Sequence, residues 1–377
     1  MKITDLQVEA YRLPPSSPWE DATNRVSALE FVLVTLTTDT GLTGTGITYT
    51  VDIGGSAMKT LIEDYLSPLV LGSDPLDYER IWQRLTRQSR RLGLGLNAMC
   101  VSAIDIAVWD LIGKIHKLPL YRLLGGARDE VRSYISEINL ANDDTVDALV
   151  GRIEGYLARG YDAVKIKIGY DDFDRDVERL HAARRLVGPG KLLVDLNQKW
   201  TASEAISHAQ ALDEFRLGWV EEPLSAHDVA GHVALKQHMR TPIALGESLH
   251  SRQQILPFLT AGCVDYVQSD VAFVGGVTEW HRIADMTAGF GKPAAPHFMM
   301  ELSMHLLCAV PNGSLLEDVV GGSLTGLGLL EEPIEVKGGV GTPSSRPGHG
   351  IVFNQDALKR HVLDREEVRA SFTGGSK

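Results

Sequence analysis

The sequence predicts an α/β protein in which a parallel βα barrel follows an α+β region, and two observations support the barrel. From residue 131 onward, short apolar runs alternate with amphipathic helical segments, a pattern typical of a parallel sheet built from βα units. Eight such runs lie between residues 131 and 319, and eight strands close economically into a barrel because closure removes both sheet edges. A doubly wound open sheet is the structural alternative.

The region before the barrel combines a hairpin with helices. Residues 31–46 contain a β-rich run, an Asp-Thr-Gly turn and a second strand. Residues 97–114 keep apolar side chains at helical spacing, and Pro119 with Gly125-Gly126 marks the end of this region. We predict an α+β capping domain over residues 1–125, the barrel over 126–322, and a C-terminal return over 323–377 that packs on the cap.

Composition limits the possible partners. The 377-residue chain is 44% hydrophobic with a formal charge of −12, so nucleic-acid phosphates or an anionic membrane would meet a negative field. No apolar run is long enough to cross a bilayer, and the first residues alternate like a strand instead of forming a signal peptide. Cys100, Cys263 and Cys308 lie far apart among apolar residues, which indicates buried thiols. We expect a cytoplasmic protein that binds a small molecule, and neither nucleic acid nor membrane.

Most of the predicted strands end in a residue that can carry chemistry. The strands are residues 131–138, 163–169, 192–197, 218–223, 242–247, 264–270, 292–298 and 314–319. Any single acid or histidine at a strand end is as plausibly a turn or capping residue. Six in register make coincidence improbable, and in a βα barrel the carboxyl ends of the strands meet at one mouth. The six are Asp195, Glu221 (with Glu222 beside it), Glu247, Asp270, His297 and Glu317.

Asp195, Glu221 and Glu247 come from three consecutive strands and are expected to lie side by side. Three adjacent carboxylates repel one another unless a cation neutralises them, and an all-oxygen set prefers Mg²⁺ over zinc. We interpret them as ligands of Mg²⁺, with a solvated acidic rim as the alternative.

Lys165 and Lys167 are two residues apart on the second strand, so both face the barrel interior. Two neighbouring ammonium groups near a divalent cation lower each other's pKa, which favours a neutral lysine that acts as a base. Lys167, nearer the mouth, is the candidate base. A packed lysine stem and a Schiff-base lysine are the alternatives, although the second does not require three carboxylates.

Asp270 and His297 end consecutive strands, so an Asp–His hydrogen bond that fixes the ring tautomer is expected. His297 lies about three strands from Lys167, so the two residues can address opposite faces of a substrate. Proton removal beside a carboxylate leaves an enediolate, whose charge the metal, a lysine and a protonated Glu317 would stabilise. The alternative for Glu317 is an exposed glutamate.

These motifs together resemble the mandelate racemase subgroup of the enolase superfamily over almost the whole chain. The motifs are Lys165-Ile166-Lys167, Asp195-Leu196-Asn197, Glu221-Glu222-Pro223, Gly246-Glu247, Asp270 and His297, with residues 104–114, 119–126 and 346–353 resembling the linker and the C-terminal return. The resemblance implies a (β/α)₇β TIM-like barrel with an α+β cap formed by the N-terminal region and C-terminal tail. It also implies a catalytic Mg²⁺, a Lys/His pair acting beside a carboxylate, and a homo-oligomer, often an octamer.

Within the subgroup, residues 195–200, 221–232, 241–247 and 295–306 are most similar to acid-sugar dehydratases of the talarate/galactarate type. A lyase of this kind removes the α-proton through Lys167 or His297, and an acid, for which His297 is the candidate, helps the β-hydroxyl leave as water. A racemase or epimerase of a 2-hydroxy acid uses the same parts and returns the proton on the other face. Cycloisomerisation of a lactone is a third outcome, for which His297 is less expected.

Substrate choice in such enzymes depends largely on cap loops, here residues 13–26 and 46–55. Candidate substrate contacts are Trp19, Arg25, Tyr49, Asn197 and Lys199. A diacid needs a distal cation, which Arg25, Lys199 or the Arg90-Arg91 pair would provide, although each is more often a surface charge.

Two other classes of protein are disfavoured. A non-catalytic scaffold predicts a broken site, yet every expected position is filled. A dinucleotide oxidoreductase needs GxGxxG, whereas residues 41–46 read GLTGTG, which we attribute to hairpin turn chemistry.

Overall fold

The computed structural model describes residues 1–17, 19–366 and 368. The capping region contains a three-stranded antiparallel sheet in the order β1 (Ile3–Leu13), β4 (Leu29–Thr38) and β5 (Thr43–Val51). Helix α4 (Gly95–His116) packs against this sheet and buries nearly all of its length. Smaller helices, α1 (Gly55–Leu61), α2 (Tyr78–Thr86) and α3 (Ser89–Leu92), complete the cap. The predicted hairpin and long helix are both present.

Two glycines of β5 explain how closely the sheet approaches α4. A β-carbon on Gly44 would lie 2.4 Å from the Ala107 carbonyl oxygen, and one on Gly46 would lie 2.0 Å from that of Ala103. Only glycine fits such a contact. The attribution of the whole 41–46 segment to turn chemistry is therefore wrong: Gly41 has the positive φ (79°) that the turn requires, whereas Gly44 and Gly46 are packing residues.

The barrel contains the eight predicted strands. They are β6 (Val131–Ser136), β7 (Val164–Lys167), β8 (Leu192–Asp195), β9 (Val220–Glu221), β10 (Ile243–Leu245), β11 (Tyr266–Ser269), β12 (Ala294–Pro296) and β13 (Leu316–Val319). Consecutive strands from β6 to β12 pair in parallel, and β13 pairs with β6. Near β12 the ring closes through the Ser314 amide, which donates to the Ala294 carbonyl at 2.9 Å. The (β/α)₇β barrel of the α/β class is confirmed.

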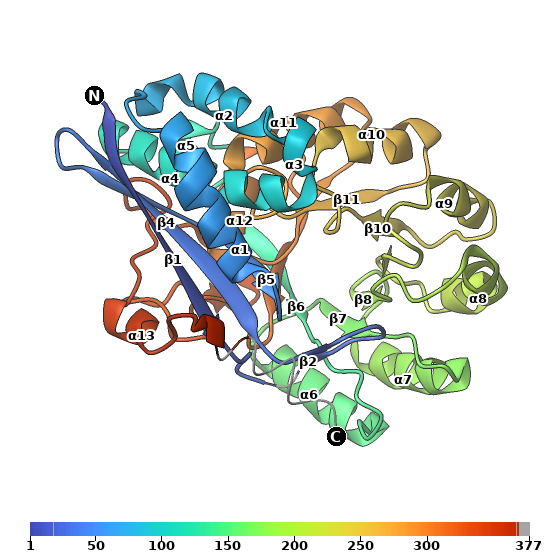
Figure 1. The fold of residues 1–377 in the computed structure, drawn as a ribbon. Coiled ribbons are helices and arrows are strands. Elements are labelled where there is room, and N and C mark those ends of the chain that lie inside the picture. The colour runs from blue at the N-terminus through green and yellow to red at the C-terminus, as the bar shows by residue number, and fades with distance from the viewer. Residues whose placement is uncertain (18, 367, 369–377) are drawn as a thin grey trace.

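Seven helices alternate with these strands and cover the outside of the barrel (Figure 1). Polar residues begin most of them: Thr145 and Asp172, for example, accept backbone hydrogen bonds at the starts of the first two helices. Because each helix runs back along the barrel, every strand presents its carboxyl end to the same mouth. The helices are α6 (Val146–Ala158), α7 (Phe173–Leu186), α8 (Ala202–Glu214), α9 (Val229–Lys236), α10 (Arg252–Ala261), α11 (Val277–Gly289) and α12 (Met300–Ala309).

A small hairpin, β2 (Trp19–Glu20) with β3 (Arg25–Val26), connects the cap to the mouth of the barrel. The Trp19 indole donates to the Val320 carbonyl at 3.0 Å, just after β13. Glu20 forms a bridge to Asn139, in the segment that follows β6. The hairpin is thus attached to the barrel at both sides of the β6–β13 junction.

The C-terminal segment contacts both the barrel and the cap. Strands β14 (Val336–Lys337) and β15 (Val340–Gly341) form a short hairpin, and β15 pairs with β6. Farther along, the His349 ring is 2.8 Å from the Thr45 carbonyl, and the Leu363 amide donates to the Ala10 carbonyl at 2.8 Å. The domain boundaries at residues 125 and 322 stay predictions.

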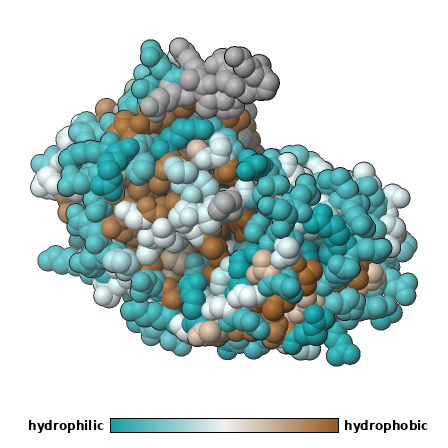
Figure 2. Space-filling model, turned by 90° about the horizontal axis from the view of Figure 1, so that it is seen from below, coloured by the Kyte–Doolittle hydropathy of each residue, from teal (hydrophilic) through white to brown (hydrophobic). Residues whose placement is uncertain are grey.

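Cys100, Cys263 and Cys308 are buried and free, as expected. The face shown in Figure 2 is largely hydrophilic with separate apolar patches. Within the described part of the chain, no helix combines the length and the apolar character needed to cross a membrane.

A buried carboxylate joins the cap to the barrel. Asp105 of α4 accepts hydrogen bonds from the Thr278 amide (2.9 Å) and hydroxyl (2.7 Å) at the start of α11. Burial raises the pKa of Asp105 from 3.8 to about 7, although the bonds from Thr278 and the charge of Arg282 oppose this rise. Ionisation in the folded protein is therefore costly.

This pKa predicts a pH dependence of stability. The folded protein keeps the Asp105 proton where the unfolded chain has lost it, so stability from this group is present below pH 3.8 and lost as pH rises through about 7. Between pH 5 and 8 the free energy of unfolding of the wild type should fall by roughly 2–3 kcal/mol relative to Asp105→Asn. Urea denaturation of both proteins at each pH measures this difference. Parallel stability profiles would contradict the assignment.

Candidate metal and catalytic site

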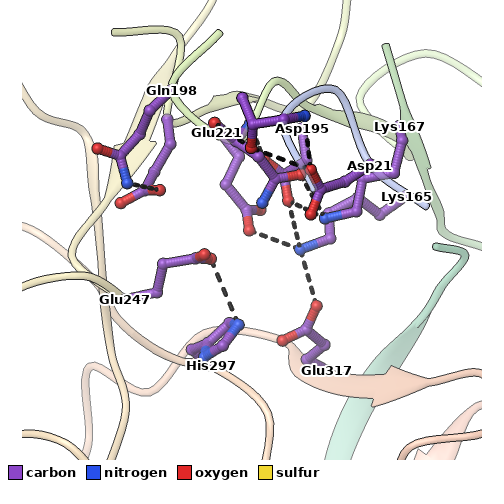
Figure 3. Close-up of polar contacts among 12 residues, drawn as sticks. Asp21, Lys165, Lys167, Asp195, Gln198, Glu221, Glu247, His297 and Glu317 are labelled. Carbon is purple, nitrogen blue, oxygen red and sulfur yellow. Dashed lines mark hydrogen bonds and ion pairs between the residues drawn. The ribbon is translucent and has the colours of Figure 1, made fainter. Parts of the chain in front are cut away.

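Three carboxylates gather at the mouth of the barrel, as the sequence predicted. Asp195 ends β8, Glu221 ends β9, and Glu247 follows β10 by two residues. One oxygen from each lies within 4.8 Å of one from each of the others, and this group is a candidate metal site (Figure 3). Consecutive parallel strands bring the three together because their carboxyl ends lie side by side.

The triad fits Mg²⁺ by its donor chemistry. All three ligands are carboxylate oxygens, the type that a hard divalent cation prefers. One oxygen of Glu247 is buried with no hydrogen-bond partner among the described residues, and its ion-pair contact is the His297 ring at 3.4 Å, so this oxygen can still bind a cation. The Trp219 indole donates to Glu221 at 2.9 Å and the Asn197 amide to Asp195 at 2.9 Å, so the outer oxygens are held in place.

Both lysines of β7 face the same interior, as the period of a strand requires. The Lys165 ammonium lies 2.6 Å from Glu221 and 2.7 Å from Glu317, and that of Lys167 lies 2.5 Å from Asp195 and 2.9 Å from the Asn197 side-chain oxygen. Lys165 is therefore enclosed by carboxylates, whereas Lys167 lies nearer the mouth.

Lys165 lowers the pKa of Lys167, as expected, but the surrounding carboxylates outweigh this effect. Burial lowers the pKa of Lys167, and Lys165 lowers it further, but the charge of Asp195 with smaller contributions from Glu247 and Glu221 outweighs both and raises it. Burial also lowers the pKa of Lys165, but Glu221 and Glu317 outweigh burial and raise it well above its ordinary value. The positive charge of a bound Mg²⁺ would oppose this attraction.

The surroundings of Glu317 oppose the protonated form that we expected. Burial alone would raise its pKa, but Lys165, His297 and hydrogen bonds to Lys165 and the Phe298 amide together lower it. Its two oxygens lie 2.7 Å from the Lys165 ammonium and 2.8 Å from the Phe298 amide. Glu317 thus holds Lys165 in position through an ion pair, and its protonated form in catalysis stays a prediction.

The predicted Asp–His pair is present at the ends of β11 and β12. Asp270 lies 2.9 Å from Nδ1 of His297 and accepts a hydrogen bond of 2.6 Å from the Tyr49 hydroxyl. Nε2 of His297 faces Glu247 at 3.4 Å. Burial lowers the pKa of His297, but Glu247, the hydrogen bond that the ring donates to Asp270, and Glu317 raise it to about 10. Figure 3 shows His297 on one side of the site and Lys165 and Lys167 on the other.

Five of these groups line one cavity of about 700 Å³ between the barrel and the cap: Lys165, Lys167, Glu247, His297 and Glu317. This volume suits a small organic substrate. Of the predicted substrate contacts, four line the cavity: Trp19, Arg25, Tyr49 and Asn197. The Tyr49 hydroxyl is already engaged with Asp270, and the Asn197 side chain with Lys167.

The other predicted cations lie elsewhere. Lys199 pairs with Asp171 at 2.9 Å and does not line the cavity, and neither do Arg90 and Arg91 on α3. Asn197 and Gln198 both have a positive φ (44° and 64°), so the chain turns back before Lys199. Proximity in the sequence to Asp195 was therefore a misleading signal.

Sequence reasoning missed a polar group beside the metal candidates. The Gln198 amide donates to Glu222 at 2.8 Å and to Ser248 at 2.9 Å, and all three line the cavity. The sequence could have indicated this group, because its three members directly follow Asn197, Glu221 and Glu247. Asp21 and Asp52 of the cap loops were missed as well, and they also line the cavity.

Comparisons with known proteins agree with this geometry. Residues 4–125 match the model of the mandelate racemase / muconate lactonizing enzyme N-terminal domain, and residues 148–357 match that of the enolase C-terminal domain-like family. A 3,6-anhydro-α-L-galactonate cycloisomerase of Streptomyces coelicolor is 33% identical over 95% of this chain and 99% of that protein. An L-talarate/galactarate dehydratase of Salmonella typhimurium is 32% identical over 92% of this chain and 88% of that protein.

A solved structure is similar throughout. It is described as a racemase from Streptomyces coelicolor with bound magnesium, has a TM-score of 0.91 and 32% identity, and covers 96% of this chain and 100% of that one. The names of these relatives carry three different reaction outcomes, so they identify the family and its magnesium cofactor without deciding the reaction. The chain belongs to the enolase superfamily, with the two-domain arrangement of mandelate racemase and muconate lactonizing enzyme.

Proposed function

We propose that this protein is a Mg²⁺-dependent lyase that dehydrates an acid sugar to a 2-keto-3-deoxy acid. The observation that carries the proposal is that Lys167 and the His297–Asp270 pair face one cavity from different sides, beside three clustered carboxylates. A base and an acid in separate positions are what removal of an α-proton and departure of a β-oxygen require.

In this proposal Asp195, Glu221 and Glu247 hold Mg²⁺, which when bound stabilises negative charge on the substrate carboxylate. Lys165, fixed by Glu221 and Glu317, places a second positive charge beside the same carboxylate. Lys167 accepts the proton from C2. His297, oriented by Asp270, donates a proton to the oxygen on C3 as the C3–O bond breaks, and water leaves.

The similarity to a cycloisomerase of an anhydro sugar acid favours a second outcome on the same site. If the oxygen on C3 belongs to a ring, the same proton removal and C3–O cleavage open the ring, and the oxygen stays attached to the product. A racemase or epimerase needs no C3–O cleavage, because the proton returns to C2 on the other face. The homo-oligomer, often an octamer, that the resemblance implies stays a prediction.

The test is a screen of purified protein with Mg²⁺ against mono- and diacid sugars, which measures 2-keto acid and, in D₂O, deuterium at C2. Keto acid from one or a few related sugars is the expected result. Deuterium uptake without keto acid would favour the racemase. If neither appears with any acid, the proposed function is wrong.

A further inference from the structure

The barrel side and the cap side of the cavity carry different charged groups. The barrel side carries three cations, Lys165, Lys167 and His297, together with the carboxylates of Glu222, Glu247 and Glu317. The cap side is lined by members of two loops, residues 19–26 and 49–53. A substrate carboxylate next to the reacting carbon belongs with the cations of the barrel side, so the other end of the substrate faces the cap.

The cap side carries two carboxylates, Asp21 and Asp52, which contact hydrogen-bond donors of the cap and, in the part of the chain that the structure describes, no cation. Each is partly exposed and accepts three hydrogen bonds, all at one oxygen, Oδ1. No lysine or arginine forms an ion pair with either carboxylate among the described residues. The donors are the Thr23 amide and hydroxyl and the Asn24 amide for Asp21, and the Ser27 amide and hydroxyl and the Ala28 amide for Asp52.

Positive charge on this side is limited to Arg25 among the described cavity residues. Its side chain is 83% exposed and lies 4.0 Å from Glu20, so its charge is screened by solvent and shared with a carboxylate. Arg12 reaches only the backbone carbonyl of Asp52 and pairs with the buried Glu30. A second substrate carboxylate would thus meet two like charges and one exposed cation.

Part of the cap wall is apolar. Val26, Val51 and Ile53 line the cavity, and Ile53 is 58% exposed. These side chains offer no hydrogen bonds to a charged group, and a carboxylate placed against them would lose hydration without compensation. An uncharged end of a substrate does not bear this cost.

We propose that the site selects acids with a single carboxylate whose opposite end is uncharged, and discriminates against dicarboxylates. The proposal rests on the proposed function, because that function places the reacting carboxylate on the barrel side. Repulsion from Asp21 and Asp52 supplies the discrimination, and the apolar wall accommodates the uncharged end.

The test compares a six-carbon aldonate with the aldarate of the same configuration, across the configurations that the protein accepts. We expect kcat/KM for the monoacid to exceed that for the diacid by at least tenfold. In the double variant Asp21→Asn/Asp52→Asn the ratio should fall at least threefold. Asparagine keeps an oxygen for all the loop hydrogen bonds, and it tolerates the positive φ of Asp52 (62°), so the change is one of charge.

Asp171→Asn is the matched control, because Asp171 is 94% exposed and lies outside the cavity residues. The ratio should not change in this variant. The proposal would be overturned if kcat/KM for the diacid equalled that for the monoacid, or if the double variant left the ratio of the two values unchanged. Either result would leave the proposed function standing.

If neither acid yields keto acid or deuterium, the proposed function fails, and calorimetric binding with Mg²⁺ then decides the charge preference separately. Tighter binding of the monoacid supports the proposal, whereas tighter binding of the diacid, or binding of neither, overturns it.

Discussion

In a His297→Asn variant, formation of 2-keto acid is expected to fall by about 10²–10⁴-fold, while exchange of the C2 hydrogen with solvent continues. Asparagine has no proton to give to the leaving oxygen at neutral pH, but Lys167 and its contacts with Asp195 and Asn197 remain. Product formation is followed with a carbonyl reagent, and deuterium uptake in D₂O is followed by NMR or mass spectrometry.

The reciprocal variant, Lys167→Ala, separates the two roles. If Lys167 removes the proton, this variant loses exchange and product together, because elimination depends on the earlier step. If exchange instead persists in Lys167→Ala and disappears in His297→Asn, the roles of base and acid are reversed. Tyr49→Phe is a useful third variant, because it removes the 2.6 Å hydrogen bond to Asp270 and keeps the His297 ring itself.

The barrel and the main site groups were predictable because strand geometry constrains them. A parallel strand alternates its side chains, so Lys165 and Lys167 had to share one face, and both are buried in the interior. Consecutive strands then place the residues at their ends next to one another, which brings Asp195, Glu221 and Glu247 together. These relations depend only on the position of each residue in its strand.

The remaining features depend on distances that the sequence does not contain. Whether Glu317 is ionised is decided by Lys165 and His297, which lie far from it along the chain. Lys199 was expected to contact the substrate, but it lies outside the cavity residues because two successive left-handed residues redirect the chain after Asp195. Asp21 and Asp52 join the cavity through loops, whose paths no periodic pattern describes.

Glu247→Gln is expected to weaken Mg²⁺ binding by at least a hundredfold, roughly 2.7 kcal/mol. Among the proposed ligands, Glu247 gives the clearest test because it pairs with neither lysine; its ion-pair contact is His297 at 3.4 Å. Removing the charge of Asp195 or Glu221 would instead take away the ion-pair partner of a buried lysine and destabilise the fold. A weaker affinity for Mg²⁺ could then reflect either a lost ligand or a less stable protein. The affinity is measured by calorimetric titration of Mg²⁺ without substrate.

Glu222→Gln is the matched control, since Glu222 is a buried carboxylate of the same cavity that contacts Gln198 and Ser248 and lies outside the triad. Saturating Mg²⁺ should stabilise the wild type and Glu222→Gln against heat by about 2.7 kcal/mol when its concentration is a hundred times the Kd, and should stabilise Glu247→Gln far less. An equal loss of affinity in both variants would mean that the metal responds to the total negative charge of the cavity. Loss confined to Glu247→Gln would identify Glu247 as a ligand, because Glu222 lines the same cavity but lies outside the triad.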